Sequence, residues 1–281
     1  GGKDPMIVLE NANLENAANA AVWGAFANSG QTCASVERCY VHESIAEKFV
    51  EKVVELTKKL NQNIGCESCE IGSMSSEKQL EIVENHVQDA IKNGAKVLMG
   101  GKRNTNLNGG AFFEPTILTE INHDFKAMRE ETFGPTLPIM TFKTDDEAVR
   151  LANDSDFGLT ASVWTSDTKR GKRIAKQIEA GTVTINEVLY THGIAQTPWG
   201  GVKQSGYGRT HGKLGLMELV YPQHIHTNNL PFLPSLWWFD YSPDAQNLFR
   251  GIARNFSTGS MFQTSKLVPQ MLKRLRDKRN K

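Results

Sequence analysis

The sequence predicts an α/β domain with a mostly parallel sheet that helices cover on its faces. Strand-like runs alternate with amphipathic helical runs along the chain, which is the pattern of such domains. Hydrophobic residues make up 39% of the 281 residues, an ordinary share that excludes a disordered or fibrous chain. With 32 Lys+Arg against 31 Asp+Glu the net charge is +1, so no global charge favours binding to nucleic acid.

The first elements follow from apolar spacing. Residues 14–27 favour a helix, because small apolar residues share one face and Gly30 follows as a stop. Residues 45–60 have the strongest helical pattern, with apolar residues on one face and Glu and Lys opposite. Residues 7–9 and 37–41 are short apolar runs on either side of the first helix, and we expect them to be strands.

A capping box opens the third helix. Ser76 stands three residues before Gln79, and the apolar spacing then continues to Ile91, with Asn93 and Gly94 as the end. The helix–strand alternation continues beyond it. The further expected helices are 145–153 and 169–180, and the further expected strands are 95–99, 163–164 and 182–185.

The composition changes near Asn228, so we expect one domain over residues 1–228 and an aromatic, basic, helical tail over 229–281. Residues 246–281 contain nine basic residues and one acidic residue, a net charge of +8 that leaves −7 for residues 1–245. The longest apolar run, 231–239, is about half a membrane span, so no transmembrane helix is expected. The tail fits peripheral contact with an anionic membrane or a solvated docking helix.

The cysteines and the start of the chain indicate which cellular compartment to expect and whether the chain is a fragment. The pair Cys66 and Cys69 has metal-like spacing but no matching second pair, so we expect free thiols, a reducing compartment and no metal site. No secretion signal is visible, which favours the cytoplasm, with membrane association through the tail left open. The chain starts at Gly1 without an initiator Met, so we expect a fragment of a longer protein.

The run 28–33, Asn-Ser-Gly-Gln-Thr-Cys, places the Cys33 thiol in a loop between a helix and a strand. A thiol there can attack an electrophilic carbon while the Cys33 N–H meets the resulting oxyanion. Only a few per cent of an ordinary thiol is ionised at pH 7, and a helix C-terminus disfavours the thiolate. Activation must therefore come from elsewhere, such as a base or a cationic cofactor ring. The alternative is a small buried hydrophobe.

Two later runs are also candidates. In residues 130–135, Glu-Glu-Thr-Phe-Gly-Pro, a carboxylate beside an aromatic ring suits bidentate contact with a ribose diol, although a solvated acidic turn fits as well. Residues 197–209 contain four glycines, which allow close backbone approach. This third run lacks the spacing of either standard phosphate loop, so it cradles a phosphate in another way or is a tight structural crossing.

Together and in this order, the three runs resemble motifs of the NAD(P)-dependent aldehyde dehydrogenase superfamily. The run 26–33 is similar to its cysteine active-site signature, and Glu131 with Phe133 matches its Glu-x-Phe-Gly-Pro motif. The run 197–209 resembles its Pro-Phe-Gly-Gly-x-Lys motif, with Trp199 in place of the usual Phe. The resemblance extends from Gly1 to about Asn228.

The resemblance implies NAD(P)-dependent oxidation of an aldehyde to a carboxylic acid. Cys33 would form a thiohemiacetal and then a thioester, with its own N–H and an Asn of the family's preceding half as the oxyanion hole. Glu131 would bind the nicotinamide ribose, Phe133 would limit the position of the ring, and Asn186 and Trp199 would lie near the substrate. The general-base Glu and the adenosine-binding half would precede Gly1, so the chain would be inactive alone.

The resemblance also implies the family's catalytic-domain fold, with an oligomerisation strand at 217–226 that adds to a sheet of a partner subunit. We therefore expect a homodimer or homotetramer of the intact protein. Two alternatives stay open. Coenzyme A, rather than water, would take the acyl group in an acylating enzyme, and the residue two places before Gly1 discriminates these. The chain would otherwise be a non-catalytic binding or assembly half.

Overall fold

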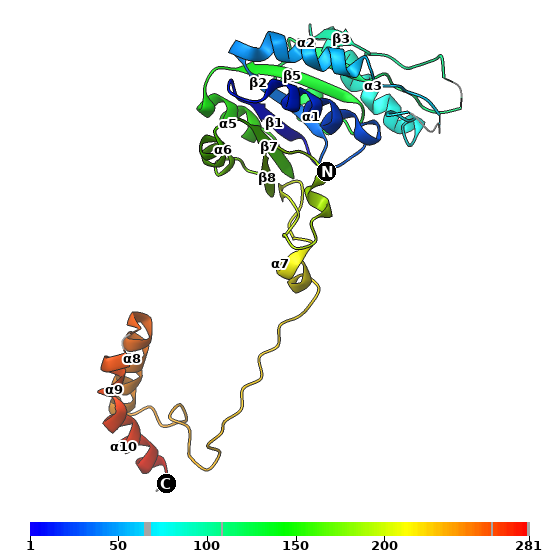
Figure 1. Ribbon diagram of the computed structural model, residues 1–281. Coiled ribbons are helices and arrows are strands. Elements are labelled where there is room, and N and C mark those ends of the chain that lie inside the picture. The colour runs from blue at the N-terminus through cyan, green and yellow to red at the C-terminus, as the bar shows by residue number, and fades with distance from the viewer. Residues whose placement is uncertain (65–68, 108, 260, 280–281) are drawn as a thin grey trace. The chain divides into compact units, whose positions relative to one another are not determined.

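The computed structural model describes residues 1–64, 69–107, 109–259 and 261–279. The chain forms two compact units, Gly1–Tyr221 and Pro222–Lys281. The first unit is built on a seven-stranded sheet in the order β3-β4-β5-β2-β1-β7-β8 (Figure 1). Strand β3 is antiparallel to β4, and the other pairings in this sheet are parallel. The expectation of a mostly parallel sheet with helices is confirmed.

The strands of this sheet are β1 Asp4–Val8, β2 Val36–His42, β3 Lys96–Met99, β4 Thr116–Thr119, β5 Thr136–Phe142, β7 Thr160–Trp164 and β8 Thr182–Ile185. A separate small pairing joins β6 Phe157–Gly158 and β9 Val202–Lys203. The helices of this unit are α1 Leu14–Phe26, α2 Ala46–Thr57, α3 Glu77–Lys92, α4 Lys126–Arg129, α5 Asp145–Asn153, α6 Thr168–Ala175 and α7 Gly212–Met217.

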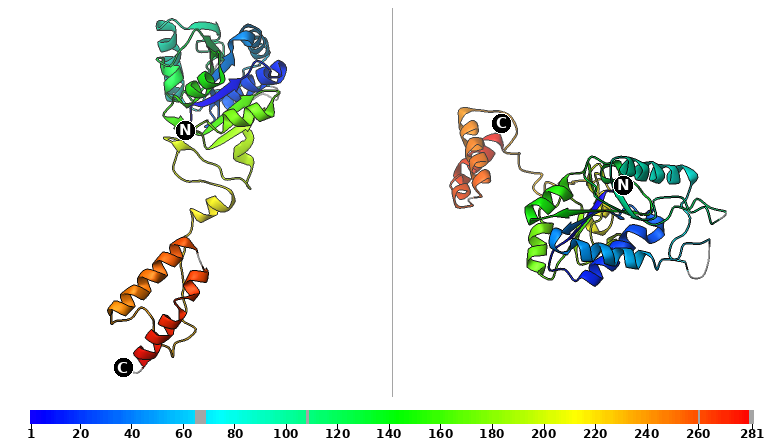
Figure 2. Two further views of the ribbon diagram at one scale, coloured as in Figure 1. Left: turned by 90° about the vertical axis from the view of Figure 1, so that its left-hand side faces the viewer. Right: turned by 90° about the horizontal axis from the view of Figure 1, so that it is seen from above.

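Helices cover both faces of the sheet (Figures 1 and 2). Successive strand residues point to opposite faces, so Met6 and Val8 of β1 pack in the cluster that contains α1 and α2. Ile7 points the other way, into the cluster that contains residues of α3, α5 and α6. Both clusters are sealed from water, which is what a parallel sheet requires of its two faces.

Strand order sets the place of the candidate residues. Strands β5, β2 and β1 are neighbours and parallel, so the three strands begin side by side at the same end of the sheet. Cys33 lies just before β2, Glu131 and Phe133 lie just before β5, and Gly2 lies just before β1. Three segments that are distant in sequence therefore converge there.

Several element ends differ from the expected ones. Helix α2 ends at Thr57 rather than at residue 60, because the last turn tightens into i→i+3 hydrogen bonds such as that from the Leu60 N–H to the Thr57 carbonyl, 3.1 Å. Helix α6 ends at Ala175 rather than at residue 180. The Asn153 side chain binds the Gln177 carbonyl and the Glu179 N–H, both at 2.8 Å, and draws that segment away from helical bonding.

The expected strand at 217–226 is absent from the single chain. Met217 is the last residue of helix α7, and residues 221–228 carry no regular secondary structure. A strand of this kind is defined by its hydrogen bonds to a neighbour, and the expected neighbour belongs to another subunit. Pairing of this segment with a partner therefore stays a prediction.

The second unit is helical, with α8 Pro243–Thr258, α9 Met261–Ser265 and α10 Val268–Arg279. No helix among the described residues is long and apolar enough to cross a bilayer. The first unit ends at Tyr221, before the expected division at residue 228, and the assignment of functional domains stays a prediction. Cys66 of the expected free-thiol pair lies outside the described residues.

Candidate active site

Cys33 is presented by a tight turn at the amino end of β2. The Ser35 N–H donates to the Thr32 carbonyl at 2.9 Å, which closes the turn around Cys33. The Ser35 hydroxyl donates to the Gly24 carbonyl of α1 at 2.9 Å and ties the turn to that helix. Cys33 is half-buried, whereas Cys39 on β2 is completely buried. Cys33 is therefore partly exposed on a turn that two hydrogen bonds hold in place.

Gly30 packs the Cys33 loop against the loop that carries Glu131. Its φ of +71° lies in the left-handed region that favours glycine, and an added Cβ would lie 2.1 Å from the Gly134 carbonyl oxygen. A larger residue would thus push the first and second sequence motifs apart. The glycine at this position is explained by contact between the two loops.

Gly2 lies between Cys33 and Glu131. Its N–H donates to Oε1 of Glu131 at 2.8 Å. An added Cβ on Gly2 would lie 2.7 Å from the Cys33 carbonyl oxygen and 2.7 Å from Oδ1 of Asp4. The Cys33 turn, the Gly2 backbone and the Glu131 carboxylate are therefore immediate neighbours.

Glu37 holds the backbone on which Phe133 stands. Its carboxylate accepts the Thr132 N–H at 2.8 Å and the Phe133 N–H at 2.9 Å. It also pairs with the Lys3 ammonium at 2.6 Å, and both side chains are buried. Phe133 has a φ of 50°, a strained conformation for a residue with a side chain. The two hydrogen bonds that the Glu37 carboxylate accepts stabilise that backbone conformation.

Helix α3 supports the same loop from its first turns. The Ser76 hydroxyl accepts the Gln79 N–H at 3.2 Å, which confirms the predicted cap. The Gln79 amide does not complete the capping box. It donates to the Thr132 carbonyl at 2.9 Å and to the Phe133 carbonyl at 3.3 Å. The Phe133 segment is therefore bound at its N–H by Glu37 and at its carbonyl by Gln79.

The surroundings of Cys33 disfavour its thiolate. Burial, and then the Asp4 carboxylate, raise the pKa of the Cys33 thiol. Burial also raises the pKa of Asp4 to about 8, although the Thr160 N–H and hydroxyl donate to it at 3.0 Å and 2.7 Å. The groups around Cys33 therefore do not favour the thiolate, and activation of the thiol from elsewhere stays a prediction.

Asn186 is engaged within the protein rather than turned toward an open site. Its amide oxygen accepts the Thr165 N–H at 2.8 Å, and its amide nitrogen donates to the Thr165 carbonyl at 2.9 Å. Both ends of the side chain hold the end of strand β7. This geometry fixes the Asn186 side chain, and its expected contact with substrate stays a prediction.

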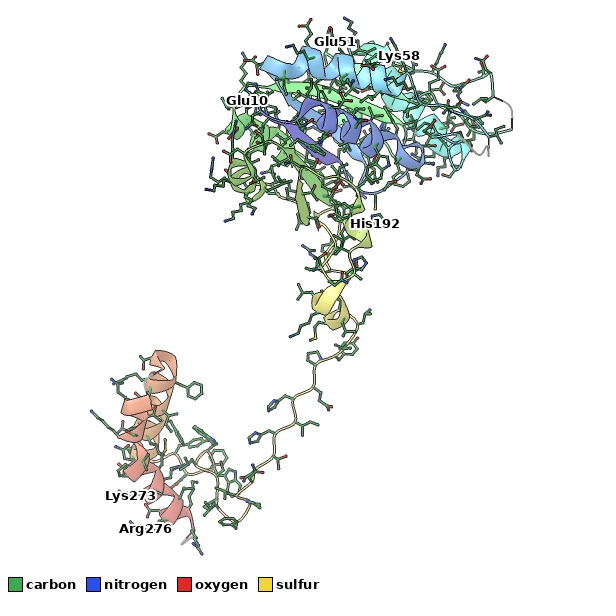
Figure 3. The ribbon with its side chains drawn as sticks, viewed as in Figure 1. Glu10, Glu51, Lys58, His192, Lys273 and Arg276 are labelled. Atoms are coloured by element: carbon green, nitrogen blue, oxygen red, sulfur yellow. The ribbon has the colours of Figure 1, made fainter. Side chains whose placement is uncertain are left out.

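Trp199 lies in the glycine run between two histidine rings. The ring centroid of His192 is 6.5 Å away and that of His211 is 6.4 Å away, and Figure 3 labels His192. Among the described residues the Trp199 Nε1–H has no hydrogen-bond partner. In the same run Arg209 donates to the Gly201 carbonyl at 2.7 Å, which is an anchoring contact.

Asp4, Lys3 and Glu37 are the site residues that sequence reasoning missed. The available signal was Glu37, a charged residue inside a strand-like run, where a buried charge needs a partner, whereas Lys3 and Asp4 precede the apolar run at 7–9. In the part of the chain that the structure describes, no three His, Cys, Asp or Glu side chains lie close enough together to hold a metal ion.

The model of the aldehyde dehydrogenase family matches residues 1–225. A 4,4'-diapolycopene aldehyde oxidase of Methylomonas sp is 42% identical over 99% of this chain and 51% of its own length. A putative succinate-semialdehyde dehydrogenase [NADP(+)] of Mycobacterium bovis is 42% identical over 85% of this chain and 47% of its own length.

Among solved structures, betaine aldehyde dehydrogenase from Staphylococcus aureus in complex with NAD+ superposes with a TM-score of 0.80 at 37% identity. The match covers 85% of this chain and 47% of that structure. The chain thus spans about half the length of the curated relatives that it matches. A family match over 1–225, with the same fold at this identity, settles membership. The chain belongs to the aldehyde dehydrogenase family.

Proposed function

We propose that this chain is the catalytic half of an enzyme that oxidises an aldehyde to a carboxylic acid with NAD or NADP. One observation carries the proposal. Cys33, Gly2 and Glu131 are immediate neighbours at the amino edge of β5, β2 and β1. Family membership supports the reaction class.

The proposed chemistry takes place on the Cys33 sulfur. A group outside this chain takes the Cys33 proton, the thiolate attacks the aldehyde carbon, a C–S bond forms, and the carbonyl oxygen becomes an oxyanion that the Cys33 N–H can bind. Loss of a hydride from that carbon converts the thiohemiacetal to a thioester. Water then cleaves the C–S bond, releasing the carboxylate and returning the thiol. The base that activates this water lies, in our proposal, outside the chain.

The residues present fit the nicotinamide end of a dinucleotide. Glu131 uses Oε1 for the Gly2 N–H, while its Oε2 has no hydrogen-bond partner within the described ranges and is suited to a ribose hydroxyl. Phe133 is fixed by Glu37 and Gln79, so its ring can limit where a neighbouring ring lies. Bound NAD(P) would supply the hydride acceptor. The solved relative contains NAD+, and the Mycobacterium relative is named for NADP(+).

We propose an apolar aldehyde as the substrate. Trp199 replaces the usual Phe of the third motif, and its larger ring should narrow the pocket. The Methylomonas oxidase also aligns over 99% of the chain, tail included, whereas the Mycobacterium relative aligns over 85%.

Cytoplasmic location and assembly through 217–226 belong to the same proposal. The exposed side chains of Leu219, Tyr221 and Ile225 support that assembly.

The test compares the longer protein that carries this chain with the isolated 281-residue chain. We expect aldehyde-dependent formation of NADH or NADPH by the longer protein, loss of it in Cys33→Ser, and retention in Cys39→Ala. We expect none from the isolated chain. Steady turnover by the isolated chain, or by Cys33→Ser, would overturn the proposal. Release of an acyl-coenzyme A only when coenzyme A is added would favour the acylating alternative.

A further inference from the structure

The unit formed by residues 222–281 presents a fixed aromatic loop. Arg274 of α10 is only 9% exposed, and its guanidinium donates to the carbonyls of Leu236, Trp238 and Asp240, each at 2.7 Å. The same guanidinium lies 5.1 Å from the centre of the Phe249 ring of α8. Three carbonyls converge on one buried cation, so the loop at 236–240 has a defined shape.

That shape leaves large aromatic side chains in water. Trp237 stacks on Phe249 with ring centroids 5.3 Å apart, while Trp238 is 62% exposed and Phe239 is 82% exposed. Exposed aromatic residues in a row are unusual on a free protein surface and mark contact sites. Trp in particular favours a membrane–water interface, where its ring is apolar and its N–H stays hydrated.

Helix α10 adds an apolar and basic stripe. Val268 and Leu272 are exposed and recur at helical spacing with Arg276 and Arg279. Figure 3 shows Lys273 and Arg276 projecting from this helix. Residues 222–281 contain nine basic residues against three acidic ones, a net charge of +6. Positive charge beside exposed apolar side chains complements an anionic lipid surface.

We propose that residues 222–281 bind the surface of an anionic bilayer, with Trp238 and Phe239 inserted at the interface and the net positive charge of the unit attracting it to the lipid headgroups. No described helix is long and apolar enough to span a bilayer, so the contact is peripheral. Single-stranded nucleic acid would use the charge and stack its bases on Phe239, but it offers no apolar phase for exposed aliphatic side chains such as Leu230. The use of this binding, which is to bring the enzyme to apolar aldehydes that dissolve in membranes, rests on the proposed function. The binding itself does not.

The test is co-sedimentation of the whole 281-residue chain with phosphatidylcholine vesicles, with and without phosphatidylserine. We expect binding only when phosphatidylserine is present, weakened by salt. The double variants Trp238→Ser/Phe239→Ser and Arg276→Glu/Arg279→Glu should each lower the affinity about tenfold or more. Matched controls in the other unit are Trp23→Ser and Lys172→Glu/Lys176→Glu, which should bind like the parent.

Circular dichroism and thermal unfolding verify that each variant is folded. Failure of the parent to bind, equal binding by the loop variants, or equal losses in the controls would overturn the proposal. Binding to a single-stranded RNA in preference to vesicles would overturn it in favour of nucleic acid. The Cys33→Ser chain should bind vesicles as the parent does, so a failure of the proposed catalysis is distinguished from a failure of membrane binding.

Discussion

The Gly2 N–H donates to Oε1 of Glu131 at 2.8 Å, although 129 residues separate them in the chain. The other side of Gly2 faces the Cys33 carbonyl. One backbone amide therefore lies between the proposed nucleophile and the proposed ribose ligand. The space at this position is narrow, because an added Cβ would lie 2.7 Å from the Cys33 carbonyl oxygen.

Gly2→Ala should therefore destabilise the first unit. Overpacking of a tight site costs about 1–3 kcal/mol, or several degrees in the unfolding temperature for a domain of this size. Gly72→Ala is the matched control, because an added Cβ there meets no atom within 4 Å. Thermal unfolding followed by circular dichroism makes the comparison. Equal unfolding temperatures for the two variants would show that the site at Gly2 is not tight.

Glu37→Gln should destabilise the protein more strongly. The change leaves Lys3 buried at 2.6 Å from a group without charge, and breaking a buried pair costs about 3–5 kcal/mol. It also weakens the acceptor for the Thr132 and Phe133 N–H groups. Urea unfolding measures the loss.

The double variant Lys3→Met/Glu37→Gln is the control for that experiment. It removes the uncompensated ammonium, so we expect it to recover part of the stability lost in Glu37→Gln. A double variant less stable than Glu37→Gln would mean that Lys3 is stabilised by groups other than Glu37.

The sequence predicts helix α3 and the central strands β1 and β2, but not strands β4 and β5. Helix α3 could be placed because its cap, Ser76 with the Gln79 N–H, is local. Strand β5 could not, because Pro138 lies within it and lacks the N–H of a central strand residue. It is a strand because β2 and β4 pair with it on either side.

The candidate site shows the same division. Cys33, Glu131 and Phe133 stand in contiguous motifs, so the sequence alone indicates them. The Glu37–Lys3 pair joins β2 to the residue just before β1, and neither segment alone determines how the two strands are aligned. Asn186 matched a family position, yet its role depends on the Thr165 backbone beside it.

Asp4 should make stability depend on pH. Burial raises its pKa from 3.8 to about 8, so the folded protein holds this proton more tightly than the unfolded chain. Its contribution to stability is complete below about pH 4 and is lost as the pH rises toward 8. Asp4→Asn stays neutral, so its unfolding temperature should fall less than that of the parent between pH 5 and pH 8.

Asp124→Asn, which changes an exposed carboxylate, is the control for the pH series. It should follow the parent at every pH. A parallel decline of Asp4→Asn and the parent would show that Asp4 does not titrate in this range.

Iodoacetamide should label Cys33 before Cys39 in the folded chain. Cys33 is half-buried on an open turn, while Cys39 is completely buried in the core. Because burial and Asp4 raise the pKa of the Cys33 thiol, its labelling rate should keep rising up to and beyond pH 9. Peptide mass mapping at several pH values measures both rates. Faster labelling of Cys39, or a rate for Cys33 that levels off below pH 8, would contradict this.

The most direct measurement is the mass of the peptide that contains Cys33 after a protein that combines this chain with the proposed cofactor-binding half is mixed with an aldehyde and oxidised cofactor and quenched in acid. We expect an acyl group on the Cys33 sulfur, at most one per chain, that disappears when the aldehyde or the cofactor is omitted. An unmodified Cys33 beside an acylated residue elsewhere, or full turnover by Cys33→Ser, would contradict it.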